Sequence, residues 1–472
     1  MGAIKFGTDG WRAIIGDQFT FDNLERVTRA TAIWLKKTRT ERPKVVIGHD
    51  LRFQGRAFSE HVARVLIDEG ATVLFADTFT TTPAVSWATL EYGCDAGIVI
   101  TASHNPPAYS GFKIKAAFGG PATPPMTKAV EAEIMDEPAG RPLPKFHELV
   151  EDGRVELRDL NTAYLDALRG RLDIEAIRAA GLTVAHDAMY GASQGLVRAL
   201  LGDDRVLELH AEHNPGFHGQ PPEPIERNLG ELAEAVVREG CAVGLANDGD
   251  ADRIGMYDER GTFVTSHLIL SLLVKYLVEK RGLTGDIAKT FSTTHMLDRM
   301  AAHYGLTLHT EPIGFKHIAG HIVEGDILVG GEESGGISAK GHIPERDGIY
   351  IGLLIVEMMV KRGLTLSALV EELYEQFGPH HTYRIDATTT PAAKERVMER
   401  LAQGGLDEVA GHSVTEVRTT DGYKHVVEDG WVLIRPSGTE PLLRVYSEGT
   451  TPELAVALVE NAVEQLGIRD ER

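Results

Sequence analysis

Short apolar segments rich in β-branched residues alternate with helix-length segments through residues 44–329. In the first part of this region the predicted strands are 44–49, 72–76 and 96–101, and the predicted helices are 55–69 and 83–92. Such alternation is typical of a mostly parallel sheet with helices on its faces. The pattern therefore predicts an α/β fold.

The alternation of strands and helices occurs three times, and each occurrence, or pass, ends in a strand followed by a polar loop that contains glycine. The second pass has predicted strands at 182–187, 206–210 and 242–246, with helices at 192–201 and 229–239. The third has helices at 268–280 and 295–303, with strands at 287–292, 307–311 and 327–329. This recurrence predicts three similar α/β domains with mixed, mostly parallel sheets.

After Pro379 the sequence changes to short strands and two helices, at 393–401 and 452–466. This change predicts a smaller C-terminal α+β domain. We place the four domains at 1–150, 151–265, 266–378 and 379–472, arranged around a central cleft.

The first loop reads TASHNP at residues 101–106. Its proline ends the strand, so Ser103 lies on a tight loop at the carboxyl end of a strand, where ligands collect in open α/β sheets. Ser103 is a candidate nucleophile or phosphoryl carrier, and the adjacent His104 is a candidate proton carrier. A polar turn without a chemical role is the alternative for so short a string.

Three aspartates, Asp248, Asp250 and Asp252, alternate along the loop that ends the second pass. On an extended loop such side chains point alike and offer three hard oxygen ligands, which suits Mg²⁺. An EF-hand loop begins with the same alternation, but its sixth position requires glycine and holds Arg253 here. The loop also agrees with a phosphatase that uses Asp248 as nucleophile, and with a solvated acidic turn that has no ligand.

The last two loops suit a phosphorylated sugar. The third reads GGEESGG, in which Glu332 and Ser334 can accept and donate hydrogen bonds to sugar hydroxyls. The fourth offers hydroxyls, a glycine and two arginines, which suit an anionic phosphate. These residues are Arg435, Ser437, Gly438, Thr439 and Arg444.

Charge and cysteine content exclude several classes of protein. The 472 residues include 48 basic and 69 acidic side chains, a formal charge of −21, which argues against nucleic acid or an anionic membrane as partner. Cys94 and Cys241 form no disulfide framework in a chain this long, so we expect buried thiols in a reducing cytoplasm. The N-terminus lacks the apolar core of a signal peptide, and the longest apolar stretch, 267–278, is too short to span a membrane.

The four loops, in this order and at this spacing, resemble those of the α-D-phosphohexomutase superfamily over essentially the whole chain. The matching segments are 101–106, 248–253, 331–335 and 435–441. Within the superfamily the chain is most similar to phosphoglucomutases, through GEESG at 331–335, GFK at 314–316 and HIPERDG at 342–348. Phosphomannomutase-type relatives usually have histidine at the place of Gly336, and phosphoglucosamine mutases usually have glutamine at the place of Glu333.

The resemblance implies an intramolecular phosphotransferase that interconverts glucose 1-phosphate and glucose 6-phosphate through a phosphoserine at Ser103 and a bound glucose 1,6-bisphosphate. It implies Mg²⁺ held by Ser103 and the three aspartates. Arg12 and Lys113 would neutralise charge on the transferring group, and Lys113 or His104 would be the general base. The implied substrate-binding residues are Arg253, Lys316, Glu332, Ser334, His342, Arg435, Ser437, Gly438, Thr439 and Arg444.

Several alternatives remain open. A phosphomannomutase or phosphoglucosamine mutase would use the same scaffold, because a one-residue difference does not exclude relaxed specificity. A sugar phosphatase using Asp248 would release inorganic phosphate and need no serine phosphate. A non-catalytic sugar-phosphate sensor is expected to lack one chemical element of the site, yet all are present. A monomer and a homodimer both agree with the sequence.

Overall fold

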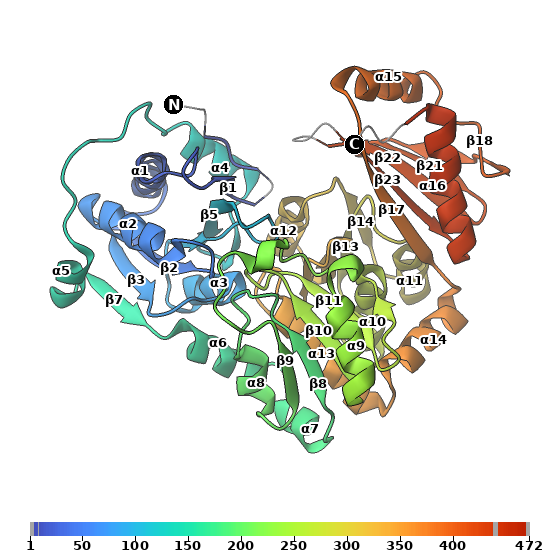
Figure 1. The fold of residues 1–472 in the computed structure, drawn as a ribbon, viewed down its shortest axis with the longest axis horizontal. Helices are drawn as coiled ribbons and strands as arrows, with labels where there is room; N and C mark the ends of the chain where they lie inside the picture. Colours follow the sequence, from blue (N-terminus) through green and yellow to red (C-terminus); the bar gives the residue numbers. More distant parts are fainter. Residues whose placement is uncertain (1–3, 8, 438–441, 469–472) are drawn as a thin grey trace. The chain divides into compact units, whose positions relative to one another are not determined.

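The computed structural model describes residues 4–7, 9–437 and 442–468. The chain divides into two compact units, the first formed by Met1–Asp286 with Gly314–Leu369 and the second by Ile287–Ile313 with Val370–Arg472 (Figure 1). Gly438 and Thr439, which were predicted to bind phosphate, lie outside the described residues. In the part of the chain that is described, no helix is long and apolar enough to cross a bilayer.

The N-terminal sheet of the first unit has the strand order β1-β5-β4-β2-β3-β7, with β6 paired to β5. Its strands are β1 (Trp11–Ile14), β2 (Lys44–His49), β3 (Thr72–Ala76), β4 (Ala96–Ile100), β5 (Tyr109–Ala116), β6 (Gly120–Pro121) and β7 (Val155–Arg158). The pairs β4–β2, β2–β3 and β3–β7 are parallel, whereas β4–β5 and β5–β1 are antiparallel. The sheet is therefore mixed, as predicted.

Helices cover both faces of this sheet; they include α1 (Phe21–Thr38), α2 (Gly55–Asp68), α3 (Thr82–Glu91), α4 (Pro124–Glu131) and α5 (Phe146–Glu151). Val45 and Ile47 of β2 pack in the apolar core that includes side chains of α1 and α2, and Gly48 faces the other way, towards α3. A Cβ atom at Gly48 would lie 2.5 Å from Thr80 Cγ2 and 2.6 Å from Val85 Cγ2. Only glycine therefore allows this close approach of helix to strand, and burial on both faces explains the uninterrupted apolar runs.

The second sheet has the order β12-β11-β10-β8-β9, in which β9–β8 and β8–β10 are parallel and the remaining pairs antiparallel. Its strands are β8 (Val184–Asp187), β9 (Val206–Leu209), β10 (Val243–Asn247), β11 (Ile254–Asp258) and β12 (Phe263–Val264). The nearby helices are α6 (Leu160–Arg169), α7 (Ile174–Ala179), α8 (Leu196–Leu201) and α9 (Gly230–Glu239). The helix predicted at 192–201 begins only at Leu196, because Gly195 has φ +75°, outside the helical region.

The third α/β segment contributes to both units. In the first unit, β15 (Ile327–Gly331) and β16 (Ile337–Ala339) pair antiparallel beside α10 (Ser266–Glu279), α12 (Phe315–Glu324) and α13 (Gly348–Arg362). In the second unit, β13 (Asp286–Thr290) and β14 (Leu308–Glu311) pair in parallel, with α11 (Met296–Tyr304) between them in the chain. Strand β13 begins at the last residue of the first unit.

The C-terminal sheet of the second unit is entirely antiparallel, in the order β17-β23-β22-β21-β20. Its strands are β17 (His381–Thr388), β20 (Glu416–Arg418), β21 (Tyr423–Val427), β22 (Gly430–Pro436) and β23 (Leu442–Gly449), and β18 (Glu408–Val409) with β19 (His412–Ser413) forms a separate small ladder. The helices are α14 (Leu366–Phe377), α15 (Pro391–Ala402) and α16 (Pro452–Leu466). The predicted α+β character of this region is confirmed.

Lys424 of β21 is a buried lysine within the second unit. Its Nζ lies 3.9 Å from the ring centroid of Trp431 and 4.8 Å from that of Phe291. Burial, and then the charge of Lys289, lower the pKa of Lys424 well below its ordinary value. The folded protein therefore holds fewer protons at this position than the unfolded chain over the pH range between the two pKa values.

Lys424→Met tests this consequence. Because the pKa of Lys424 is lower in the folded protein than in the unfolded chain, unfolding takes up a proton between the two pKa values. Over that range, which ends near pH 10, the free energy of unfolding should rise with pH by at most about 1.4 kcal/mol per pH unit. Lys424→Met should be at least as stable as wild type at pH 7 and should lack this rise. Denaturant titrations at several pH values measure it, with Lys280→Met, an exposed lysine, as control. Parallel wild-type and Lys424→Met curves would contradict the prediction.

Candidate active site

Ser103 lies on the loop between β4 and β5, with 1% of its surface exposed. Its φ is +52°, a left-handed conformation that is uncommon for residues other than glycine. The Ser103 N–H donates to Thr101 Oγ1 at 2.9 Å, and its hydroxyl donates to Asp248 Oδ2 at 2.6 Å. His104 Nδ1 lies 3.3 Å from Ser103 Oγ. The structure thus brings the predicted phosphoryl carrier and proton carrier to the first predicted metal ligand.

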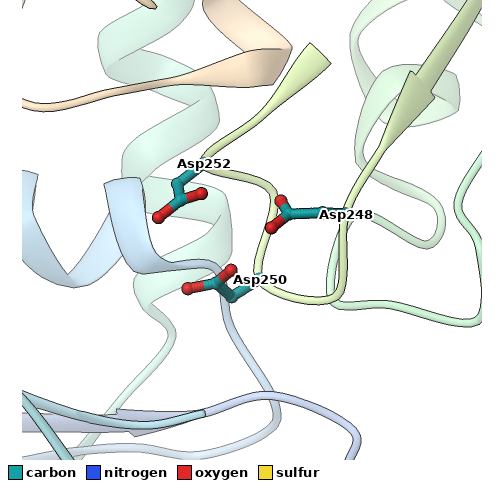
Figure 2. Close-up of side chains that lie close together, drawn as sticks. All are labelled: Asp248, Asp250 and Asp252. Carbon is teal, nitrogen blue, oxygen red and sulfur yellow. The ribbon is translucent and has the colours of Figure 1, made fainter. Parts of the chain in front are cut away.

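The three aspartates lie on the short connection between β10 and β11 (Figure 2). All three are buried, and one carboxylate oxygen of each lies within 4.8 Å of the others. Asp250 Oδ1 and Asp252 Oδ1 are buried with no hydrogen-bond partner among the described residues. Buried carboxylate oxygens without donors suit a hard cation, so these residues fit a Mg²⁺ site. An EF-hand loop does not fit, because residues 254–258 form β11.

Crowding of the carboxylates perturbs their protonation. Burial, followed by the charges of Asp252 and Asp250, raises the pKa of Asp248 well above its ordinary value. By contrast, Arg346 and Lys113 overcome the effect of burial at Asp252 and hold its pKa below the ordinary value. In the absence of a cation, burial and crowding therefore favour the protonated form more at Asp248 than at Asp252.

Lys113 of β5 is the main cation beside the three aspartates. Its Nζ lies 2.8 Å from Asp9 Oδ2, 2.8 Å from Asp250 Oδ2 and 2.9 Å from Asp252 Oδ2. Burial lowers the pKa of Lys113, but these carboxylates outweigh it and hold the pKa above its ordinary value. Lys113 is therefore a protonated donor in this geometry and is poorly suited to act as a base.

His104 has the opposite electrostatic setting. Burial, and then the charges of Arg253 and Arg12, lower the pKa of His104 well below its ordinary value. The imidazole is therefore neutral near pH 7 and has a nitrogen free to accept a proton. Arg12 of β1 donates from Nη1 to Asn105 Oδ1 at 2.6 Å, which places its guanidinium beside the serine loop.

The loop predicted to bind sugar, between β15 and β16, lies against the metal loop, the connection between β10 and β11 that carries the three aspartates. A Cβ atom at Gly335 would lie 2.5 Å from the Ile254 carbonyl oxygen, so glycine is required for this contact. Glu332 is buried, and burial raises its pKa to about 7. Arg346 joins the two loops, with Nη1 3.8 Å from Glu332 Oε2 and Nη2 2.7 Å from Asp252 Oδ2. Ser334 lies on the same connection, between β15 and β16.

The other predicted substrate-binding residues of the first unit lie in different settings. Arg253 ends the metal loop, with Nη1 3.8 Å from Glu223 Oε1. Lys316, in the first turn of α12, helps to line a cavity of about 110 Å³ that Asp9 also lines. The side chain of His342 is 1% exposed; its Nε2 lies 2.7 Å from Asp347 Oδ2, and its ring stacks on that of Tyr350 with the centroids 4.2 Å apart. This packing favours a structural role for His342.

The described residues of the predicted phosphate clamp lie within the second unit. Arg435 of β22 and Arg444 of β23 occupy directly paired positions in the antiparallel ladder. Arg435 Nε lies 2.9 Å from Asp421 Oδ2, and neither guanidinium is fully buried. Ser437 N–H donates to the Leu442 carbonyl at 3.0 Å. Two cations and a hydroxyl residue therefore gather at one end of this sheet.

Two residues of the site were not predicted from the sequence. Asp9 pairs with Lys113, Lys115 and Arg346, and Arg346 also contacts Asp252. Both lie in short glycine-bearing strings, GTDG at 7–10 and HIPERDG at 342–348. The sequence does not show that Asp9 and Arg346 are buried, because a single charged residue in a loop is more often exposed.

Family models for the phosphoglucomutase/phosphomannomutase α/β/α domains I, II and III match residues 3–140, 162–261 and 265–377, and the model of the C-terminal domain matches 390–465. The chain belongs to the phosphoglucomutase/phosphomannomutase family. The resemblance to the α-D-phosphohexomutase superfamily and the prediction of three α/β domains with a C-terminal domain are both confirmed.

Individual relatives cover the whole length of the chain. A phosphoglucomutase/phosphomannomutase of Thermococcus kodakarensis is 32% identical over 465 residues, covering 98% of each chain. A probable phosphoglucosamine mutase of the same organism is 31% identical over 457 residues, covering 97% of each. A solved structure from Thermus thermophilus, named provisionally as a phosphomannomutase, has a TM-score of 0.87 at 34% identity and 99% coverage of each chain. The protein is a phosphohexomutase, an isomerase that moves a phosphoryl group within a phosphosugar.

Asp248→Asn tests the metal site. Near pH 7 in chelator-treated protein, folding favours the uptake of a proton at Asp248, whereas asparagine already resembles the protonated acid, so the variant should be at least as stable as the wild type. Added Mg²⁺ should stabilise the wild type, by about 2.7 kcal/mol at a hundred times its Kd, and should stabilise Asp248→Asn much less. Thermal unfolding with and without Mg²⁺ measures both effects. The control is Asp203→Asn, whose side chain is 94% exposed; equal Mg²⁺ stabilisation of Asp248→Asn and wild type would refute the site.

Proposed function

We propose that this phosphohexomutase interconverts glucose 1-phosphate and glucose 6-phosphate through a phosphoserine at Ser103 and a bound glucose 1,6-bisphosphate. The observation that carries the proposal is the placement of Ser103 Oγ 2.6 Å from Asp248 in a buried group of three carboxylates. A phosphoryl group at this position would be surrounded by Arg12, Lys113 and a cation site, which together balance its charge.

The proposed half-reaction breaks the bond between phosphorus and Ser103 Oγ and forms a bond from phosphorus to the free hydroxyl oxygen of the sugar phosphate. The sugar hydroxyl loses a proton and Ser103 Oγ gains one. His104 is suited to carry this proton, because its imidazole is neutral and lies 3.3 Å from Ser103 Oγ. When bound by Asp248, Asp250 and Asp252, Mg²⁺ would supply Lewis-acid stabilisation of the transferring group.

The second half-reaction runs in reverse with the other phosphate of the bisphosphate. It requires the sugar to turn around, so one set of hydroxyl contacts must serve two orientations. Glu332 and Ser334 are proposed to bind the sugar hydroxyls in both. Arg435, Arg444 and Ser437 are proposed to hold whichever phosphate is not reacting, since charge-assisted bonds from arginine suit phosphate.

Glucose is the proposed sugar because of Gly336 and Glu333. A Cβ atom at Gly336 would lie 2.5 Å from Arg346 Cδ, so the histidine usual in phosphomannomutase-type relatives does not fit this arrangement without movement of Arg346. Activity on mannose or glucosamine phosphates is the second candidate, supported by the relatives that carry those names. Glucose, mannose, glucosamine and N-acetylglucosamine 1-phosphates, assayed for 6-phosphate product, decide between them.

Ser103→Ala tests the phosphoserine. Intact mass should show part of the wild-type protein heavier by one phosphate after incubation with glucose 1,6-bisphosphate, and the variant should lack this species. Mutase turnover should fall by about 10³-fold or more, the scale for loss of a nucleophile. Ser413→Ala, on the exposed end of β19, serves as control. Full turnover by Ser103→Ala, or release of inorganic phosphate in place of isomerisation, would contradict the proposal.

Glu332→Gln tests the shared sugar contact. Loss of a charged hydrogen-bond acceptor should lower kcat/KM, and the corresponding loss of transition-state stabilisation should be roughly 1.5–3 kcal/mol for both the 1- and the 6-phosphate. Because burial raises the pKa of Glu332 to about 7, the wild-type side chain is largely protonated at pH 6 and ionised at pH 8. The difference between wild type and variant should therefore grow as pH rises through 7. Exposed Glu324→Gln is the control; an effect on only one substrate would contradict a shared role.

A further inference from the structure

Arg52, between β2 and α2, holds the backbone of the serine loop. Its Nη2 donates to the carbonyls of Ser103 at 2.6 Å and Asn105 at 2.7 Å. Its Nη1 donates to the carbonyls of Pro106 at 2.9 Å and Tyr109 at 3.1 Å. One guanidinium therefore joins four carbonyls of the segment that carries the phosphoryl group.

The guanidinium is fully enclosed. The side chains of Arg52 and Asp50 are both 0% exposed, and Arg52 Nε lies 3.2 Å from Asp50 Oδ2. The ring of Phe217, from another part of the first unit, lies with its centroid 4.9 Å from the Arg52 Cζ atom. A buried guanidinium is stable only when its donors are satisfied, so the loop conformation and the position of Arg52 depend on each other.

Asp50 fixes the same loop from its other side. Asp50 Oδ2 accepts a hydrogen bond from Thr101 Oγ1 at 2.5 Å, and Thr101 Oγ1 accepts one from the Ser103 N–H at 2.9 Å. Ser103 itself has φ +52°. A non-glycine residue keeps this conformation only when its surroundings over-determine it. Here the Ser103 N–H donates to Thr101 Oγ1, which Asp50 holds in turn, and the Ser103 carbonyl oxygen accepts from Arg52.

We propose that Arg52 is a positioning residue for phosphoryl transfer, acting through the backbone of residues 103–109 to aim Ser103 Oγ at Asp248 and the incoming sugar hydroxyl. The inference depends on the proposed role of Ser103. Arginine is required because each of its two terminal nitrogens donates to a different pair of carbonyls, and the planar guanidinium holds both nitrogens in place. A lysine offers the same charge from a single point and cannot reach both pairs.

Arg52→Lys and Arg52→Gln are compared with Arg56→Gln. Arg56 is a matched control, because it also binds a carbonyl, that of Asp77, and lies over an aromatic ring, that of Phe75, but away from the serine loop. Misplacement of a reacting atom by about 1 Å costs on the order of 100-fold. In single-turnover transfer from phosphorylated enzyme to glucose 1-phosphate, we expect both Arg52 variants to lose about 100-fold in rate. KM should change less than threefold, and Arg56→Gln should match wild type.

Phe217→Leu is the second variant, since it loosens the guanidinium without leaving a buried polar group unpaired. It should fold, as judged by circular dichroism, and lose about tenfold in the same rate with KM unchanged. The proposal would be overturned if Arg52→Lys and Phe217→Leu both transferred the phosphoryl group at the wild-type single-turnover rate. It would also be overturned if the variants differed from wild type only in KM. If Arg52→Lys does not fold, the Phe217→Leu rate decides. Failure of the wild-type phosphoenzyme to transfer to sugar phosphate would instead refute the proposed function.

Discussion

One carboxylate oxygen from each of three buried aspartates lies within 4.8 Å of the others. These like charges repel one another, and the other residues of the site are arranged to balance that repulsion. Charges buried this closely are stable only when cations and hydrogen-bond donors compensate them. Lys113 comes from β5 and Arg346 from the segment before α13, while the aspartates lie between β10 and β11. Charge balance therefore joins three sequence-distant parts of the first unit, and Ser103 lies within the assembly that results.

Much of the fold could be predicted from the sequence because its strands are buried on both faces and appear as apolar runs. Helix α13 was not predicted, since residues 348–359 are all buried and its apolar residues therefore give no amphipathic pattern. The serine loop and aspartate loop were found because several informative residues are adjacent in each. Asp9 and Arg346 were missed, and the proposed role of Arg52 was not foreseen, because each is a single charged residue whose partners are far away in the chain.

Packing in the second unit does not follow the family's domain boundary. Phe291, which follows β13, packs with Trp431, Leu433 and Tyr446 of the C-terminal sheet in one apolar cluster. Residues 287–313 therefore form a compact body with the strands that carry Arg435 and Arg444, although the family model places them in domain III. A rearrangement that preserved this cluster would carry part of the third α/β segment along with Arg435 and Arg444.

The left-handed backbone at Ser103 limits which amino acid can serve as the proposed phosphoryl carrier. Threonine offers the same hydroxyl and is a common phosphate acceptor, but a second substituent on Cβ is strongly disfavoured at φ +52°. Cysteine is unbranched, yet it replaces the oxygen nucleophile with sulfur. The proposed role therefore makes two demands on this position, a hydroxyl group and a side chain that tolerates the left-handed backbone, and serine alone among the hydroxyl-bearing aliphatic side chains meets both.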